Sequence, residues 1–405
     1  MTSRVVVTGI GALTPIGNGF DGARKGLRDD RSGVVRMDEW QDVRGLKTLL
    51  AAPVEVDIES LLPRRKRRTM GRLAAIAAIA TGDAIADAGL ADDVVRSGRV
   101  GLAYGSTHGS TTETEGFSRT LFEHGFGKIP GTQYLKFMSN TCTINLAVLY
   151  GVRGPVLSTC AACVSSSQAL GTGVDLIRRG AVDAMLCGGA EEMCYIHAGV
   201  FDLLFATSTM NDSPETTPRP FDENRDGLVV GEGACTFVIE SLESAKARDA
   251  HIYGEILGYG TSCDGTHVTA PSADGMASAM QLALRDAGRA ADSIDYINAH
   301  ATGTKRGDIA ESIATHNVFS DRVPVSSTKG NTGHTLGACG TIESLFCLAT
   351  LADGILPATR NFQTLDPKCA PIDLITTVRE KPAQTVMNNN FAFGGINTSL
   401  IFSRF

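Results

Sequence analysis

The sequence lacks the signals that would export the protein or place it in a membrane. Residues 1–7 show no basic region, apolar core or cleavage site of a signal peptide. No uninterrupted apolar run reaches the roughly 18 residues that a membrane span needs. We therefore expect a protein that acts in the cytoplasm without contacting a membrane.

An excess of positive charge and a zinc-binding pattern are also missing. The 37 Lys and Arg residues are outnumbered by 44 Asp and Glu residues, and this balance argues against a nucleic-acid binder. Cys160 and Cys163 form a CxxC pair, but no second pair completes a zinc site. We expect no metal ion, and we expect most of the ten cysteines to be free thiols in the core.

What is present is the pattern of a large α/β protein. A chain of 405 residues with 43% hydrophobic residues is globular and too long for one ordinary core. Strand-like segments at 4–9, 100–105 and 184–189 alternate with helical periodicity at 73–88 and 164–177. This alternation predicts an α/β fold.

The second half of the chain repeats the alternation. A strand-like segment at 294–299 is followed by helical periodicity at 341–351, and 388–402 predicts a glycine-bearing turn and a closing strand. Residues 208–226, rich in Pro, Asp, Asn and Thr, predict a long surface loop. We divide the chain into an N-terminal half, 1–250, and a C-terminal half, 251–405.

Cys163 is the first candidate for a catalytic residue. It follows an expected strand and opens an expected helix in the segment STCAACVSSS at 158–167. The positive end of a helix dipole favours a thiolate, and such a turn leaves backbone N–H groups free for an oxyanion. A buried structural cysteine explains the same position equally well.

Three further segments change that balance. His300 follows a strand in NAHATGT at 298–304, and Lys329 and His334 lie five residues apart in SSTKGNTGHTLG at 326–337. The segment NNNFAFGGIN at 388–397 is rich in amides and glycine. Because α/β folds place their sites in loops at strand ends, these side chains are expected to meet near Cys163.

Together the four segments resemble the active-site motifs of elongating β-ketoacyl–acyl-carrier-protein synthases, in the thiolase-like superfamily. The resemblance covers nearly the whole chain, and thiolases lack this Cys-His-His order with a lysine between the histidines. It implies an acyltransferase with a five-layered αβαβα fold of two similar halves. It also implies decarboxylative Claisen condensation with malonyl–acyl carrier protein, in fatty-acid, type II polyketide or aryl-polyene synthesis.

The resemblance gives catalytic roles to five residues. Cys163 would be the nucleophile that holds the acyl chain as a thioester. His300 and His334 would stabilise the enolate left when malonyl thioester loses carbon dioxide, by donating from Nε2–H. Lys329 would support the histidines electrostatically, with Glu311 as its partner. No cofactor is implied, because the substrates arrive on the phosphopantetheine of acyl carrier protein.

Other residues would shape the site. Backbone N–H groups of Cys163 and Phe393 would form the oxyanion hole, and Phe393 would gate the acyl pocket. Thr302 and Thr304 would contact the phosphopantetheine arm, and Asp308 would support the site as Glu311 does. The family usually has glycine where this chain has Ala301 and Ala392, which would stiffen the gate because alanine restricts positive φ.

Two surface or pocket features remain open. His108 aligns with a position that lines the acyl pocket, where an unpaired polar group is costly beside a saturated chain; a surface or dimer-contact histidine is the alternative. The basic run at 64–68 suggests that Arg65 and Arg68, together with Lys128, receive the acidic carrier protein. A solvated helix start and an RNA site are the alternatives.

The family also leaves the assembly and two other functions open. A homodimer and a heterodimer with a related ketosynthase subunit fit equally. A chain-length-factor-like partner subunit shares the fold, although such subunits typically lack the nucleophilic cysteine. A thiolase acting on coenzyme A esters is the other alternative, and the order of the histidines and lysine argues against it.

Overall fold

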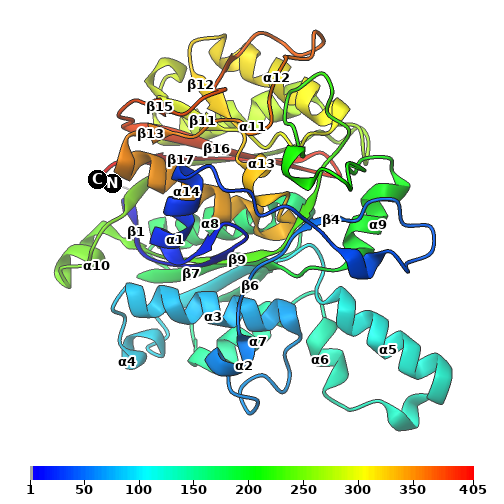
Figure 1. Cartoon of the computed structure of the whole chain (residues 1–405). Helices are drawn as coiled ribbons and strands as arrows, with labels where there is room; N and C mark the ends of the chain where they lie inside the picture. Colours follow the sequence, from blue (N-terminus) through cyan, green and yellow to red (C-terminus); the bar gives the residue numbers. More distant parts are fainter. Residues whose placement is uncertain (1–2) are drawn as a thin grey trace.

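Five strands of the first half of the chain form one side of the framework (Figure 1). The computed structural model describes residues 3–405. Three parallel strands and two antiparallel neighbours follow one another across this sheet in the order β6 (Val156–Thr159), β5 (Val100–Gly105), β7 (Ala184–Glu191), β9 (Gly233–Ser241) and β1 (Val5–Thr14). Most of these strands are buried along their length, as strands covered on both faces must be.

The second half repeats this order of strands. Beyond β1 come β10 (Gly254–Cys263), β17 (Ile396–Ser403), β16 (Thr385–Ala392), β11 (Tyr296–Asn298) and β12 (Pro324–Ser326). Again the last three pair in parallel and β17 is antiparallel. Val5 pairs with Ile256, so β1 and β10 join the two halves. The two halves are therefore similar in topology although they share few residues.

Helices complete the five layers that the sequence predicts. α3 (Arg72–Asp87) packs on the first sheet and α11 (Ala273–Ala287) on the second, while α8 (Ser165–Arg178) and α14 (Cys339–Asp353) lie between the sheets (Figure 1). The segment 336–353 is long and apolar enough to cross a membrane by composition. It is 89% buried inside the protein, because a helix between two sheets is apolar on every side.

Two expectations for irregular segments need correction. The amides of 388–392 lie on the buried strand β16, and the turn is confined to Phe393–Gly395, because β17 pairs with β16 up to Ala392. Residues 208–226 form a loop with a short 3-10 turn, but Phe221, Asp222 and Arg225 are buried. Arg225 forms ion pairs there with Asp308 and Asp366, so this part of the loop packs beneath the site.

An arm projects from the layers below the first sheet (Figure 1). It consists of α5 (Thr111–His124), the 3-10 turn η2 (Phe126–Lys128) and α6 (Gln133–Phe137). The predicted division at residue 250 falls between α10 (Leu242–Ala247) and β10, and it stays a prediction.

Candidate active site

Cys163 lies in a sharp turn between β6 and α8. The turn passes through the 3-10 segment η3 (Ala162–Val164), and Ala162 takes a left-handed φ of 50°. This geometry turns the chain abruptly from strand to helix, so Cys163 sits just before the N-terminus of α8. The side chain is buried, and its sulfur faces the histidines of the second half.

The imidazole of His334 contacts the sulfur of Cys163 directly. Its Nε2 lies 2.9 Å from Cys163 Sγ. The backbone of His334 is fixed on both sides, because its N–H donates to the Val229 carbonyl at 2.7 Å and its carbonyl accepts from Gly231 N–H at 2.8 Å. Gly333 precedes it with a φ of 63°, a conformation that favours glycine.

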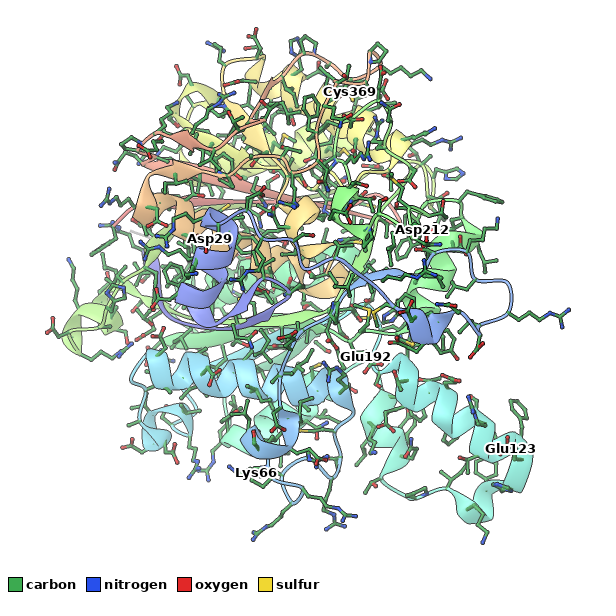
Figure 2. The ribbon with its side chains drawn as sticks, viewed as in Figure 1. Asp29, Lys66, Glu123, Glu192, Asp212 and Cys369 are labelled. Atoms are coloured by element: carbon green, nitrogen blue, oxygen red, sulfur yellow. The ribbon has the colours of Figure 1, made fainter. Side chains whose placement is uncertain are left out.

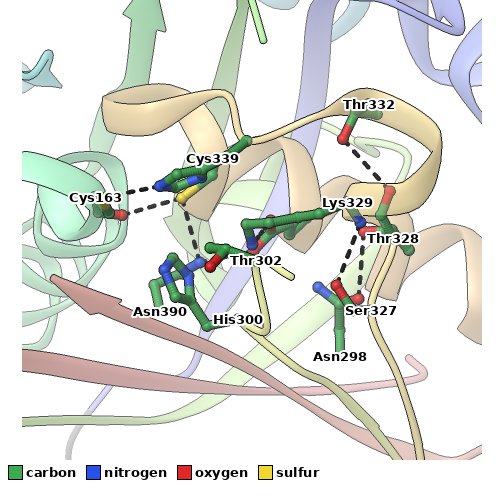
Figure 3. Close-up of polar contacts among 12 residues, drawn as sticks. Cys163, Asn298, His300, Thr302, Ser327, Thr328, Lys329, Thr332, Cys339 and Asn390 are labelled. Carbon is green, nitrogen blue, oxygen red and sulfur yellow. Dashed lines mark hydrogen bonds and ion pairs between the residues drawn. The ribbon is translucent and has the colours of Figure 1, made fainter. Parts of the chain in front are cut away.

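His300 completes the group from the end of β11. Its ring lies 5.1 Å from the ring of His334 and almost perpendicular to it. The donor atoms of Cys163, His300 and His334 all lie within 4.8 Å of one another. Figure 3 shows the side chains of Cys163, His300 and Lys329 meeting from three separate segments of the chain. The sequence motifs therefore converge as predicted.

Lys329 opens the short helix α13 (Lys329–Thr332) and is completely buried. The predicted ion pair with Glu311 is wrong: Lys329 Nζ contacts Glu343 of α14. The carboxylate of Glu311 is occupied differently, because its Oε1 accepts the backbone N–H of His300 at 2.8 Å. Asn390 donates to the other oxygen of Glu343 at 2.7 Å, which fixes the pair.

Burial controls the protonation of the site. It lowers the pKa of His300 and of His334 well below their usual range, and the positive charge of Lys329 lowers both further. Burial opposes the charge of Lys329 too, but Glu343 keeps its pKa above the ordinary value. Two neutral imidazoles beside a fixed cation suit the stabilisation of a developing anion better than the binding of a metal cation.

The thiol of Cys163 is affected in the same way. Burial raises its pKa to about 12, and the charge of Lys329 only partly opposes this. The sequence predicts a thiolate at the helix N-terminus. In the structure the loss of hydration on burial disfavours the charged form more strongly than the helix N-terminus favours it. Cys163 therefore rests as a thiol, with His334 Nε2 within hydrogen-bond distance of its sulfur.

The predicted oxyanion hole consists of the backbone N–H groups of Cys163 and Phe393. Within residues 3–405, the N–H of Phe393, in the turn between β16 and β17, donates to no backbone or side-chain acceptor. The ring of Phe393 is 38% exposed and lies 5.6 Å from the ring of Phe201. Positive φ angles fall at Gly394 and Gly395, not at Ala392 or Ala301, so neither alanine strains the backbone.

A cavity of about 470 Å³ leads to these groups. It is lined by Cys163, His300, His334 and Phe393, with the threonines predicted to contact the phosphopantetheine arm: Thr302 and Thr304. The two threonine hydroxyls lie 3.1 Å apart. Buried Asp308 accepts the N–H groups of Thr302 and Gly303, and burial raises its pKa to about 6. Asp308 thus shapes the loop that follows His300.

Four predicted residues lie away from this cavity. His108 is exposed; its Nε2 lies 3.4 Å from Thr111 Oγ1 and its ring 6.0 Å from that of His197. Arg65 and Arg68 line a separate cleft of about 1000 Å³ beside α3. Lys128, on η2, is outside that cleft. Figure 2 shows the loop around Lys66 and the arm that carries Glu123 at the same end of the molecule.

Two residues of α14 escaped the sequence analysis. Glu343 is the counterion of Lys329, and the Cys339 thiol donates to the Cys163 carbonyl at 3.0 Å. A signal for Glu343 exists in the sequence, since it is the one charged residue between Cys339 and Ala352. A charge on a helix that is apolar all round requires a buried partner.

Comparison with known proteins agrees with this site. Residues 2–245 match the β-ketoacyl synthase N-terminal domain, and 253–363 match the C-terminal domain. The chain is 37% identical to 3-oxoacyl-[acyl-carrier-protein] synthase 1 of Haemophilus influenzae, over 99% of each. It is 35% identical, over 99% of each, to a putative mitochondrial 3-oxoacyl-[acyl-carrier-protein] synthase of Schizosaccharomyces pombe.

Solved structures agree as well. A β-ketoacyl synthase of Burkholderia phymatum is 46% identical, with a TM-score of 0.96 over all of both chains. Structural neighbours at 29% identity include a type II polyketide acyl carrier protein in complex with its ketosynthase (TM-score 0.90, all of both chains). They also include a ketosynthase with its chain length factor from Xenorhabdus doucetiae (TM-score 0.87, 99% of this chain and 98% of that one).

Five layers and a cysteine facing two histidines define a thiolase-like condensing enzyme. The chain belongs to the β-ketoacyl synthase family. It is an acyltransferase of the 3-oxoacyl-[acyl-carrier-protein] synthase type, a condensing enzyme of fatty-acid or type II polyketide biosynthesis.

Proposed function

We propose that Cys163, His300, His334, Lys329 and Phe393 carry out decarboxylative condensation in the roles that the family motifs assign. The observation that carries this proposal is the contact between His334 Nε2 and Cys163 Sγ, with the ring of His300 against that of His334. In the first step the sulfur attacks an acyl thioester. The thiol proton passes to the departing pantetheine sulfur, and the acyl group stays on Cys163 as a new thioester.

In the second step malonyl thioester loses carbon dioxide and becomes an enolate. The neutral rings of His300 and His334 donate to the enolate oxygen, and the Lys329 charge favours the same anion. The enolate carbon attacks the Cys163 thioester carbonyl, whose oxyanion accepts from the N–H groups of Cys163 and Phe393. The new carbon–carbon bond forms as the Cys163 sulfur leaves and takes a proton from solvent.

Replacing the nucleophile tests this assignment. We expect Cys163→Ala to lose both covalent acylation and condensation, while the matched Cys160→Ala variant keeps both, because Cys160 is exposed and its thiol donates to the Thr107 carbonyl instead. Intact-mass measurement after incubation with acyl carrier thioesters provides the readout. Acyl adducts that persist on Cys163→Ala would falsify the assignment.

We propose acyl carrier protein as the partner that delivers both thioesters. Arg65 and Arg68 are exposed beside Arg64 in a cleft whose other cations form ion pairs within the protein: Arg67 with Glu59, Arg72 with Glu232 and Lys136 with Glu113. An acidic carrier protein matches such a surface. Lys128 lies on the arm outside the cleft, so any contact with the carrier would be separate from that of Arg65 and Arg68.

A paired assembly, either a homodimer or a heterodimer with a related subunit, is the second part of the proposal. Large apolar side chains are exposed on the arm and near the free edge of β6: Phe122, Phe126, Tyr134, Val148 and Val156. A strand at the edge of a sheet offers unpaired backbone groups to another chain. A second copy or a related chain would cover both features.

A cytoplasmic location completes the proposal. Within residues 3–405 all ten cysteines are free, as a reducing compartment requires. The chain-length-factor and thiolase alternatives are less favoured, because a subunit without catalysis has no need for a cysteine and two histidines that line one cavity, beside a buried lysine whose charge acts on both histidines.

A further inference from the structure

The mouth of the active-site cavity carries two cations without counterions. Lys305 and Arg306 begin α12 (Lys305–Phe319), line the same cavity as Cys163, and are exposed whereas Cys163 is buried. Among residues 3–405, no carboxylate lies within 4.0 Å of either charged group. A charge that is paired within the fold contributes mainly to structure. Lys305 and Arg306 are unpaired at the opening of the cavity, so they are free to bind a ligand.

Three carboxylates share the cavity, and each accepts hydrogen bonds from other groups; Glu311 Oε1 accepts the backbone N–H of His300 at 2.8 Å. Asp226 Oδ2 accepts from Ser208 Oγ at 3.0 Å and from Thr209 N–H at 2.9 Å. Asp264 accepts from Ser272 N–H at 3.1 Å and from Asn397 Nδ2 at 2.7 Å. None of these three carboxylates forms an ion pair with Lys305 or Arg306.

A third cation, Arg225, fixes the backbone at the start of α12. Buried Arg225 donates to the carbonyls of Thr304 at 3.2 Å and of Lys305 at 2.8 Å. Asp308 and Asp366 balance its charge. The start of α12 is therefore fixed before any ligand arrives, which lowers the entropic cost of binding there.

One wall of the cavity runs from the reacting atoms to this mouth. Along the chain, His300 and Thr302 are buried, Thr304 is partly exposed, and Lys305 and Arg306 are exposed. A ligand that lies along this wall with its thioester at Cys163 passes the two threonine hydroxyls before it reaches the cations. Its outer end is thus expected to be an anion.

We propose that Lys305 and Arg306 bind the phosphate of the substrate's phosphopantetheine arm. This inference rests on the proposed function, in which the thioester arrives on such an arm. The arm has a thioester at one end, two amides and one hydroxyl along its length, and a phosphodiester at the other end. Guanidinium groups bind phosphate through two parallel hydrogen bonds, and an ammonium adds a point charge.

Acyl thioesters that differ only beyond pantetheine test this subsite. Acylation of Cys163 is followed by intact mass with acyl-pantetheine, acyl-phosphopantetheine, acyl-coenzyme A and acyl carrier protein as donors. We expect the native enzyme to use acyl-phosphopantetheine about tenfold to a hundredfold faster than acyl-pantetheine at subsaturating concentration. The Lys305→Ala/Arg306→Ala variant should lose this preference while keeping the acyl-pantetheine rate.

Arg65→Glu is the matched control. Of the four donors, only acyl carrier protein should acylate Cys163 more slowly in this variant. The preference for acyl-phosphopantetheine over acyl-pantetheine should be unchanged. Acyl-coenzyme A shares the phosphate, so it should respond to the double variant and not to Arg65→Glu. Equal rates with acyl-pantetheine and acyl-phosphopantetheine in the native enzyme, or an unchanged preference in the double variant, would overturn the subsite. Absence of acylation by all four donors would contradict the proposed function instead.

Discussion

The buried residues of the candidate site differ in charge. Lys329 remains charged in the interior because Glu343 lies against it, whereas His300 and His334 remain neutral because burial and that same lysine disfavour their protonation. The arrangement places one permanent positive charge beside two hydrogen-bond donors. It suits an anion that exists only during the reaction.

The histidines carry one prediction at this scale. We expect His300→Ala and His334→Ala each to lower carbon dioxide release from malonyl thioester by about 10²–10³-fold, since each removes one donor to the enolate. Both variants should still accept an acyl group, with His334→Ala the slower because it alone contacts the sulfur. Labelled carbon dioxide and intact mass measure the two steps. Unchanged release from both variants would remove the histidines from this role.

A second prediction at this scale concerns how the reactivity of the Cys163 thiol depends on pH. Because burial raises its pKa to about 12, the thiolate is scarce at pH 7 and increases as pH rises toward that value. Alkylation of Cys163 by iodoacetamide in the acyl-free enzyme should therefore increase about tenfold per pH unit between pH 7 and 10. Peptide mapping separates Cys163 from exposed Cys160 and Cys263. A plateau below pH 8 would show that the helix dipole dominates over burial.

Among the elements, the turns and short helices at strand ends determine how the site is built. The turn before α8 presents Cys163, α13 presents Lys329, the turn after α13 presents His334, and the loop after β11 presents His300. Each begins from a strand of the central framework. β11 and β12 are paired on both sides and β6 is paired on one side, so each loop begins from a fixed position.

The loop before α3 carries the prediction for this scale. Reversing Arg65 and Arg68 to Glu should reduce kcat/KM for acyl carrier protein strongly and leave kcat/KM for a pantetheine thioester nearly unchanged. Both side chains are exposed and outside the active-site cavity, so their loss removes attraction to an acidic partner without altering the chemistry. Higher ionic strength should narrow the difference between native and variant enzyme. Equal losses on both substrates would indicate damaged folding.

At the scale of the whole molecule, the two halves supply different parts of the proposed reaction. In that proposal the first half contributes the nucleophile, and the second contributes the histidines, the lysine and the Phe393 N–H group. The active-site cavity lies where they meet, with α8 and α14 packed between the sheets. Neither half has a complete site.

The exposed apolar arm gives a prediction for the assembly. We expect Val156→Glu and Phe126→Glu to shift the protein toward a monomer in light scattering after size-exclusion chromatography, because each places a charge in an interface that is otherwise apolar. Val268→Glu is the control, since Val268 is exposed at the cavity mouth. A native protein that is monomeric at all concentrations would rule out the homodimer and leave the heterodimer with a related subunit.

The sequence by itself determined the alternation of strands and helices, the repeated pattern and which residues meet at the candidate site. The spacing of apolar residues over 164–177 and 341–351 predicted α8 and α14. Such spacing is visible in the sequence because each helix buries the face that carries those residues. The motifs around Cys163, His300 and His334 were sufficient to predict that these residues meet. Strand ends in an α/β fold bring loop residues together whatever their separation along the chain.

Only the tertiary structure decided which groups touch. The family motifs pointed to Glu311 as the partner of Lys329, yet Glu343 pairs with it, because the position of α14 relative to α13 decides which carboxylate reaches the ammonium group. The pKa of Cys163 likewise depends on how thoroughly neighbouring segments exclude water, which no local pattern records. The outward position of His108 and the turn at Gly394 and Gly395 follow from the same long-range packing and pairing.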